Sequence, residues 1–317
     1  MVFHASRAQN YINYHRINNR ADECIVNGDY KNAAVKLDSL YSGYSFIYAR
    51  HCFKALQIAC MLNDTANAYK WLSKCFLQGV PFWMIRANDL TTRSLYYPRS
   101  QSIINAHDSL YNVYRSHINL PLARTLDSMF VYDQKLTDRV NNGFFLWKVY
   151  DYPRWLHNNK KQFRKVQQFI QQYGYPGEKI IGLPESDLDS LAACKHLASR
   201  GHTYIQRIEL QYMMMHCYSN PRKDIRKELI QQIELGNLEA VQYGVYADFM
   251  YEYGRQKYGH YNRYYQWFRD HNQEDTTIIN ARRDSIGLPT LQNRKKQFAL
   301  FDSLYRYHLR NRVIADI

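Results

Sequence analysis

The chain of 317 residues has no hydrophobic run that approaches the roughly 18 residues needed to cross a bilayer. Its opening sequence, MVFHASRAQN, also lacks the apolar core of a signal peptide. A cytoplasmic protein without a membrane span is therefore expected. The six cysteines include no CxxC pair, and most lie at apolar helical positions, where a free thiol behaves as a small hydrophobic group. Neither a disulfide framework nor a structural metal is expected.

The short motifs that bind cofactors or carry out nucleophilic catalysis are absent as well. HExxH and GxSxG do not occur, and residues 254–259 lack the GxxxxGK[ST] pattern and the preceding strand of a phosphate loop. The spacings from Cys194 to His196 and from His216 to Cys217 do not project two ligands from one helical face. No cofactor, no metal site and no catalytic nucleophile is therefore expected.

Hydrophobic residues make up 46% of the chain and charged residues 22%, a balance typical of a globular protein rather than a disordered one. No stretch shows the sustained two-residue alternation of an amphipathic strand, so almost no sheet is expected. The sequence therefore predicts an all-α protein. Tyrosine is in surplus, with 29 residues, and its large ring with a polar tip suits wet helix interfaces, grooves and cores alike.

The formal net charge of +14 and the pI of about 9.4 favour anionic partners, either nucleic acid or an acidic protein or membrane surface. The alternative is a solvated surface rich in lysine and arginine. A candidate basic patch on one predicted helical face consists of Arg222, Lys223, Arg226 and Lys227. Residues 263–267 interleave a cation with aromatic rings, as a platform for stacked bases does. No recognised nucleic-acid motif accompanies these features, so nucleic-acid binding is an alternative rather than the leading hypothesis.

An internal repeat occupies about the first 80 residues. Tight-turn sequences begin at Gly28 and at Asn63, 35 residues apart. The same interval superposes small or apolar residues in pairs: Cys24 on Ala59, Ala33 on Ala68, Leu37 on Leu72, and Leu40 on Cys75. Helix–turn–helix units that recur at roughly 34 residues resemble tetratricopeptide repeats, which need small residues where two helices approach closely. Leu56 departs from that pattern, because it corresponds to Ala21, where that family has a small residue.

The rest of the chain divides at Pro121, the expected domain boundary. Before it, residues 79–114 are expected to cap the exposed end of the repeats, with aromatic cover from Phe82, Trp83, Tyr96 and Tyr97. Residues 1–120 would then form a repeat module with its cap, and residues 121–317 a second helical domain. Helices in the second domain are predicted at residues 123–142, 162–173, 186–197, 202–217 and 222–235.

The stretch from Gly236 to Phe268 is the expected centre of the second domain. Tyr243, Tyr246, Met250 and Tyr253 recur at three- and four-residue spacing, which places them on one face of a helix. Gly254 is expected to end that helix, since glycine tolerates the left-handed conformation that closes a C-terminus. A turn rich in tyrosine and histidine, residues 258–261, follows.

Several motifs occur in the order found in one bacterial family. They are the pair Asp133-Gln134, the turn at residues 173–177, the helix that ends at His196, the run from Asp248 through Gly254 to residues 256–259, and residues 281–283 with 287–289. Over residues 122–295 the chain therefore resembles the family catalogued as domain of unknown function 6624. The resemblance implies a helical domain and no known activity. Tyr175 stands where that family usually has tryptophan, and His260 where it usually has threonine.

The candidate ligand-binding corner consists of seven residues near predicted helix ends: His196, His202, Asp248, Arg255, Gln256, Tyr258 and His260. Helix ends expose backbone amides as well as side chains, so polar ligands can be held there. A histidine at this corner could act as acid or base, with Asp248 as its orienting partner. The alternative is structural: the histidines cap helices, and Tyr258 anchors the loop by packing.

The leading hypothesis is a non-enzymatic interaction protein whose amino-terminal concave face binds a partner peptide or helix, with tyrosines as anchors. The first alternative is a small-molecule binder or hydrolase-like enzyme that works at the corner of His196, Asp248, Tyr258 and His260. The second alternative is nucleic-acid binding through the basic helices, which requires the basic clusters to share one face. The sequence identifies no particular partner or ligand.

Overall fold

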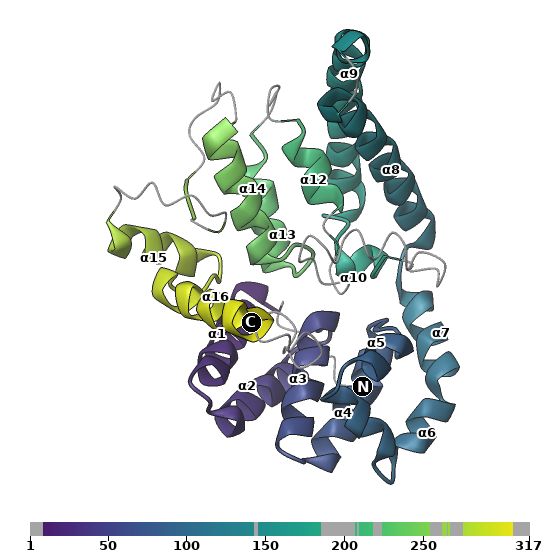
Figure 1. Ribbon diagram of the computed structural model, residues 1–317, viewed down its shortest axis with the longest axis vertical. Helices are drawn as coiled ribbons and strands as arrows, with labels where there is room; N and C mark the ends of the chain where they lie inside the picture. Colours follow the sequence, from purple (N-terminus) through teal and green to yellow (C-terminus); the bar gives the residue numbers. More distant parts are fainter. Residues whose placement is uncertain are drawn as a thin grey trace, which may run out of the picture. The chain divides into compact units, whose positions relative to one another are not determined.

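The computed structural model describes residues 9–142, 145–184, 207, 209–217, 224–253, 262–264, 266 and 275–306. Within these ranges every regular element is a helix and no strand occurs, so the predicted all-α class is confirmed (Figure 1). Neighbouring helices in the sequence pack as antiparallel pairs, as expected when short connections join amphipathic helices.

The internal contacts of the chain define two compact units. Unit 1 contains residues 1–118, 182–206 and 287–317, and unit 2 contains residues 119–181 and 207–286. The chain therefore returns to unit 1 at its C-terminal end. The division into two domains at residue 121 stays a prediction, since contact-defined units are not thereby shown to fold independently.

Unit 1 begins with two helical hairpins. The first joins α1 (Tyr11–Val26) to α2 (Tyr30–Gly43), and the second joins α3 (Ala49–Met61) to α4 (Thr65–Leu77). The connections repeat at the level of single atoms. Gly28 and Asn63 both adopt a positive φ, of 75° and 54° respectively. The next residue in each turn, Asp29 or Asp64, then caps the following helix by accepting a hydrogen bond from the backbone N–H three residues later. The predicted 35-residue repeat is therefore present in the turns.

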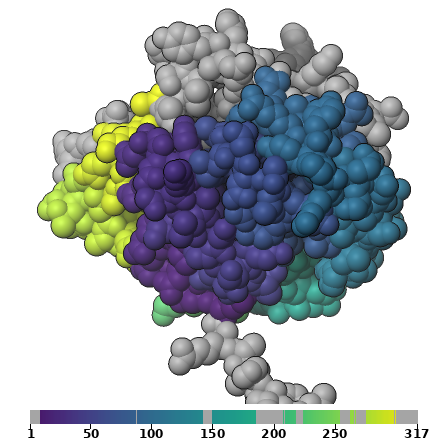
Figure 2. All heavy atoms as spheres, turned by 90° about the horizontal axis from the view of Figure 1, so that it is seen from below, coloured from purple at the N-terminus to yellow at the C-terminus, as the bar shows by residue number. Residues whose placement is uncertain are grey.

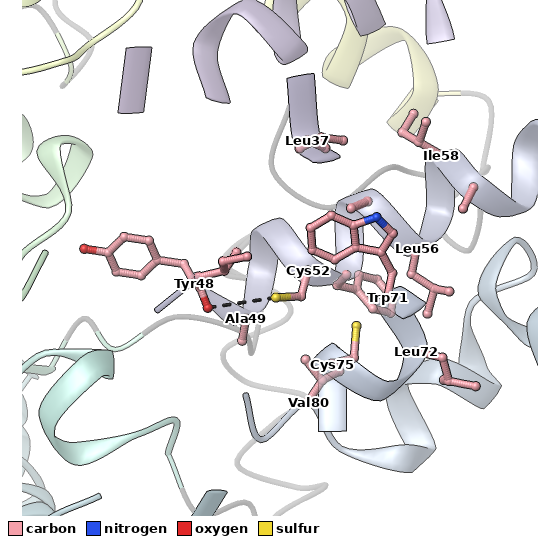
Figure 3. Packing of buried hydrophobic residues seen from close by; sticks show 14 of the residues in the cluster. Leu37, Tyr48, Ala49, Cys52, Leu56, Ile58, Trp71, Leu72, Cys75 and Val80 are labelled. Atoms are coloured by element: carbon pink, nitrogen blue, oxygen red, sulfur yellow. Dashed lines mark hydrogen bonds between the residues drawn. The ribbon is translucent and has the colours of Figure 1, made fainter. Parts of the chain in front are cut away.

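The residues that recur at this interval lie inside the module. Ala33 and Ala68 are both fully buried, as are Leu40 and Cys75, while Leu37 and Leu72 are at most 1% exposed. Figure 3 shows Leu37, Cys52, Leu56, Trp71, Leu72 and Cys75 gathered in this core. Ala21 and its counterpart Leu56 are both buried too, so the larger side chain is accommodated at the second position. Small residues at Ala33 and Ala68 allow the paired helices to approach closely.

The segment after the hairpins is irregular and helical, as expected of a cap. It contains α5 (Phe82–Ala87), the 3-10 helix η1 (Thr91–Tyr96), α6 (Ser100–Asn105) and α7 (His107–His117). Phe82, Trp83 and Tyr97 pack against the core as predicted. The prediction for Tyr96 was wrong, because its side chain is 83% exposed. Tyr96 ends the 3-10 helix, and that turn directs the neighbouring Tyr97 inward instead.

Helix α16 (Leu291–Arg306) also belongs to unit 1 and packs against α1. Figure 2 shows its yellow atoms directly beside the purple atoms of the first helices. The amide of Asn19 donates to the carbonyl of Gly287 at 2.8 Å, and Asn293 donates to the Glu23 carboxylate. Two faces of α1 are thus in use. Tyr14, Asn18 and Asp22 face α3, whereas Asn19 and Glu23 face the C-terminal segment.

Unit 2 starts with two long helices, α8 (Leu120–Asn142) and α9 (Phe145–Tyr173), packed side by side (Figure 1). The others are α10 (Glu178–Ile181), α12 (Glu209–Met215), α13 (Arg226–Glu234), α14 (Ala240–Tyr253) and α15 (Thr276–Ser285). Helix α9 begins 17 residues before the predicted start at Gln162, although it contains Pro153. Because proline is unfavourable inside a helix, the sequence pattern around Pro153 does not predict one. Packing along α8 sustains the helix there.

Helix α14 confirms the predicted aromatic helix. Tyr243, Tyr246 and Met250 are each 2% exposed, and Tyr253 at its end is largely exposed. The three consecutive methionines of α12, Met213 to Met215, are all buried, which fits a helix enclosed on every side. The predicted helix at residues 186–197 and the turn at residues 254–261 lie outside the described residues.

Candidate functional site: a buried aspartate–histidine pair

Of the seven residues of the predicted corner, the structure describes Asp248 alone. The other six, His196, His202, Arg255, Gln256, Tyr258 and His260, lie outside the described residues, so their convergence on Asp248 stays a prediction. Asp248 itself is 7% exposed on α14. Its two carboxylate oxygens accept the backbone N–H groups of Tyr264 at 2.6 Å and Gln266 at 2.5 Å.

A buried arginine completes this anchor. Arg283 on α15 is fully buried and donates to the carbonyl of Tyr264 and, at 3.3 Å, to the side-chain oxygen of Gln266. Burial lowers the pKa of Arg283 to about 10, and the negative charge of Asp248 acts in the opposite direction. Asp248 and Arg283 therefore hold one short stretch of chain from two sides. Within the described residues, Asp248 therefore anchors this stretch of backbone.

The predicted basic patch is only partly described. Arg222 and Lys223 lie outside the described residues, and Arg226 and Lys227 open α13. The guanidinium of Arg226 is paired with Asp224, 2.5 Å away, and this pairing lowers the pKa of Asp224, chiefly through the hydrogen bond. Arg226, the first residue of α13, is thus engaged by Asp224 just before the helix begins.

The strongest constellation in the described residues lies where α12 meets the pair of α8 and α9. Two hydrogen bonds fix the register of that pair: Gln162 donates to the carbonyl of Met129 at 3.0 Å, and the Trp155 indole donates to Thr137 at 3.1 Å. Asp133 lies midway between Met129 and Thr137, on the buried face of α8. The antiparallel register therefore places it opposite residues 158–159 of α9, beside the end of α12.

Asp133 is fully buried and holds a histidine. Its Oδ2 lies 2.6 Å from Nδ1 of His216, the residue directly after α12, and Gln134 donates to the same oxygen at 3.1 Å. The His216 side chain remains 19% exposed. No hydrogen-bond partner for its other ring nitrogen, Nε2, is found among the described residues. The ring is thus anchored through Nδ1, and the side chain is not completely enclosed.

Helix α9 holds the same residue through its backbone. Asn159 donates its side-chain amide to the carbonyl of His216 at 3.1 Å, and the neighbouring Cys217 thiol donates to the carbonyl of Asn159 at 3.0 Å. The Trp155 ring lies 6.0 Å from the His216 ring, centre to centre. His216 is therefore fixed by a carboxylate, an amide and an aromatic ring from two helices.

The thiol beside the histidine is not poised as a nucleophile. Burial raises the pKa of Cys217, and the negative charge of Asp133 raises it further. Its proton is also engaged with backbone carbonyls. Cys217 therefore packs and donates a hydrogen bond, and the chemistry of the site belongs to His216.

Buried polar atoms without partners surround this pair. In the described residues, no hydrogen-bond partner is found for Oδ1 of Asp133, Oδ1 of Asn159 or Oε1 of Gln162. The same holds for Asp151 Oδ2, one turn before Trp155 on α9. One buried donor, Nδ2 of Asn158, also has no partner there. Most buried polar atoms in proteins are hydrogen-bonded, so this group of mainly acceptor atoms marks a candidate place for a polar ligand.

The arrangement favours one protonation pattern at His216. With Nδ1–H donated to the Asp133 carboxylate, the neutral ring presents an unprotonated Nε2, which accepts a hydrogen bond or a proton. An oriented carboxylate–histidine pair of this kind is a general-base arrangement.

Sequence reasoning did not single out this pair. The sequence places Asp133 in a family motif and at helical spacing with apolar residues, and it rejects His216 as a metal ligand because of its spacing, but neither residue is predicted as part of a site. The available signal was an aspartate at an apolar position of a predicted helix, in register with Leu126 and Met129. A carboxylate on a buried helical face needs a partner. The identity of that partner, 83 residues away, is a tertiary fact.

No protein-family model, curated protein or solved structure matches the chain. The fold and the site therefore define it only as an all-helical protein built from paired helices. Among the described residues, none of the helices is both long and apolar enough to cross a membrane. That same part of the chain holds no cluster of three or more His, Cys, Asp or Glu side chains able to bind a metal ion.

Proposed function

We propose that the seam between α8, α9 and α12 binds a small polar ligand and that His216 accepts a proton from it. The observation that carries this proposal is the 2.6 Å contact between Asp133 and His216, whose side chain is 19% exposed. Fixing the ring before the ligand arrives avoids the cost of orienting it during the reaction. A ligand hydroxyl group that gives up its proton to Nε2 becomes a better nucleophile, so general-base activation of a hydroxyl group is the chemistry that this geometry supports.

The chemistry of the lining defines the ligand class. Four of the unpartnered atoms, on Asp133, Asp151, Asn159 and Gln162, are acceptors, and two of these belong to carboxylates; one, Nδ2 of Asn158, is a donor. A matching ligand therefore offers hydrogen-bond donors, as primary amines and hydroxyl-rich molecules do. A second anion would face the buried Asp133 carboxylate and be repelled.

The test compares ligand classes on the whole chain. Thermal unfolding is followed with a panel of primary amines and monosaccharides, and in parallel with phosphate and simple carboxylates. Donor-bearing ligands should raise the melting temperature of the wild-type protein and leave that of His216→Gln and Asp133→Asn unchanged. His157→Gln, which alters an exposed histidine of α9, is the matched control and should behave as wild type. Stabilisation by the anions alone, or an undiminished response in His216→Gln, would refute the proposal.

A second function is favoured by a separate observation. The packing of α16 on α1 supports the proposal that unit 1 binds a helix of a partner protein, as tetratricopeptide modules do. The turns repeated at 35 residues support assignment of α1 to α4 to that class of repeat. Assignment of residues 122–295 to domain of unknown function 6624 is likewise proposed, on the motifs present in the sequence.

The chain provides its own probe for this second function. A labelled peptide of residues 287–306 is added to the full-length protein, and its anisotropy is measured. The wild type should bind it weakly, because α16 already occupies α1, whereas Asn293→Ala combined with Leu291→Asp should bind it more tightly. Asn32→Ala, at an exposed position of α2, serves as the control. Equal weak binding by all three proteins would rule out a displaceable helix site.

A further inference from the structure

The outer face of α9 carries a continuous basic stripe. Tyr150, Arg154, His157, Lys161 and Lys165 are spaced four, three, four and four residues apart, which places them on one side of the helix, and all five are exposed. The stripe extends over 12 residues from Arg154 to Lys165, or roughly 16 Å at 1.5 Å per residue step. Lys160 and Arg164 are exposed beside it.

The charge of this face is not neutralised locally. Asp151 is the single acidic residue of α9, and its side chain is 1% exposed and turned to the interior. Within the described residues, Lys160, Lys161, Arg164 and Lys165 form no ion pair with any carboxylate. By contrast, the half-buried cations Lys70 and Arg226 are each paired with an aspartate. The positive potential of α9 is therefore open to a partner in solution.

Exposed aromatic rings lie at one end of the stripe. Tyr150, the first residue of the stripe, is 68% exposed. The guanidinium of Arg154 donates to the hydroxyl of Tyr132 on α8 at 3.4 Å, so a second ring, 41% exposed, lies beside the stripe. Binding of an acidic protein would require only the cations and would leave the exposed rings without a role. Exposed rings beside an arginine are the platform on which unpaired bases stack.

We infer that the outer face of α9, from Tyr150 to Lys165, binds single-stranded nucleic acid. The lysines and arginines contact phosphates, while the exposed Tyr150 ring stacks on a base. Recognition of this kind tolerates any sequence and weakens steeply with salt, because phosphate neutralisation releases counterions. This surface is independent of the His216 site, since it lies on the opposite, solvent-facing side of α9 from Trp155 and Asn159.

The experiment measures anisotropy of a labelled oligothymidylate of about 20 nucleotides, with the full chain, at salt concentrations from about 50 to about 300 mM. The triple variant Lys161→Glu, Arg164→Glu, Lys165→Glu should bind about tenfold more weakly or worse and show a shallower salt dependence. The control triple Lys31→Glu, Lys295→Glu, Lys296→Glu changes net charge equally at exposed positions elsewhere and should stay within about twofold of wild type. Circular dichroism confirms that both variants fold.

Tyr150→Ala separates stacking from charge. It should weaken binding about five- to tenfold and leave the salt dependence unchanged. Three results would overturn the inference: no binding by the wild type at the lowest salt, equal losses in both triple variants, or polyglutamate binding to α9 as tightly as the oligonucleotide. The last result would assign the stripe to an acidic protein.

Discussion

Lys54 and Asp22 form a buried ion pair between α3 and α1, with Nζ 2.5 Å from Oδ1. Lys54 is completely buried. Asn18 completes the cluster: its Oδ1 accepts from Lys54 at 2.9 Å, and its Nδ2 donates to the other oxygen of Asp22 at 3.0 Å. Both charges are therefore hydrogen-bonded, as burial requires. The cluster links the first helices of the two hairpins by polar contacts.

Removal of one partner should lower the free energy of unfolding, because the other charge stays buried. Lys54→Met is expected to lower the free energy of unfolding by about 3–5 kcal/mol, because it leaves the Asp22 carboxylate buried without its cation. Lys70→Met removes a cation of similar separation from Asp38, 2.6 Å, but at a partly exposed site, and should cost at most about 1 kcal/mol. Urea unfolding of the two variants decides the comparison. Equal losses would show that burial does not control the strength of these pairs.

The stability of unit 1 should depend on pH through His15. Burial, assisted by the positive charge of Arg50, lowers the pKa of His15 to about 3. The unfolded chain takes up this proton near pH 6.5, its ordinary value. Between these two values the unfolded state binds more protons, so the free energy of unfolding falls as pH falls, by up to about 1.4 kcal/mol per unit. His51, whose pKa burial also lowers, acts in the same direction.

Urea unfolding at about pH 7.5 and about pH 5 tests this. The wild type should lose more stability than His15→Gln, by about 1–2 kcal/mol, because the variant has no proton to take up at this position. His157→Gln, which alters an exposed histidine, should show the wild-type loss. An identical loss in His15→Gln would mean that His15 does not remain neutral in the folded protein.

The hairpin repeat predicts that a larger side chain is not tolerated at Ala33. Ala33 is fully buried against the paired helix, while Val35, two residues on, is 62% exposed. Ala33→Leu should therefore destabilise the protein by about 1–3 kcal/mol through overpacking, whereas Val35→Leu should be close to neutral. Thermal unfolding of both variants distinguishes the cases. Unchanged stability in Ala33→Leu would remove close helix approach as the reason for the small residue.

The helices and their repeat could be read from the sequence because they depend on local rules. Ala33 and Ala68 recur at the spacing of the turns, and Asp29 and Asp64 mark the helix starts. The same local rules predict a helix that is shorter than α9, because Pro153 interrupts the sequence pattern. Packing against α8 nevertheless sustains the helix through this proline. Local propensity is overridden where tertiary burial is larger.

The candidate site could not be read in this way. Asp133 and His216 lie on helices far apart in the sequence, and neither belongs to a short motif with known spacing. Their meeting depends on the register of α8 against α9 and on the end of α12. The same is true of α16, whose contact with α1 joins Asn293 to Glu23, 270 residues away. A single sequence indicates which faces are buried, but not which faces meet.

Two glycines with the same backbone conformation should respond differently to alanine. Gly28 and Gly79 have φ values of 75° and 77°. A Cβ at Gly28 would meet nothing within 4 Å, whereas one at Gly79 would lie 2.4 Å from the Tyr114 ring. That ring is held in place, because its hydroxyl accepts the N–H of Leu183 at 2.7 Å. Tyr114 therefore cannot move aside without losing a buried hydrogen bond.

Gly28→Ala is expected to cost about 1–2 kcal/mol, the penalty for the left-handed conformation. Gly79→Ala should lower the free energy of unfolding by about 1–3 kcal/mol more than Gly28→Ala does, because the added methyl group overpacks the contact with Tyr114. Urea unfolding of the two single variants measures the difference directly. Similar losses would mean that the Tyr114 ring yields without penalty.

The coupling between Asp133 and His216 is measurable in the absence of any ligand. His216→Ala leaves a fully buried carboxylate without its main donor and should cost about 1–3 kcal/mol of unfolding free energy. Asp133→Ala should cost a similar amount. The double variant should lose less than the sum, by about 0.5–3 kcal/mol, because each single variant already breaks the shared hydrogen bond.

An exposed pair of the same residue types serves as the control for this cycle. His107 Nδ1 lies 2.9 Å from Asp108 Oδ1, but the Asp108 side chain is 97% exposed. Water replaces either partner there, so the coupling energy should vanish within error. A coupling at Asp133 and His216 as small as that at His107 and Asp108 would show that the buried contact does not orient the histidine. The proton-accepting role of His216 would then lose its physical basis, since nothing else in the described residues fixes the protonation of Nδ1.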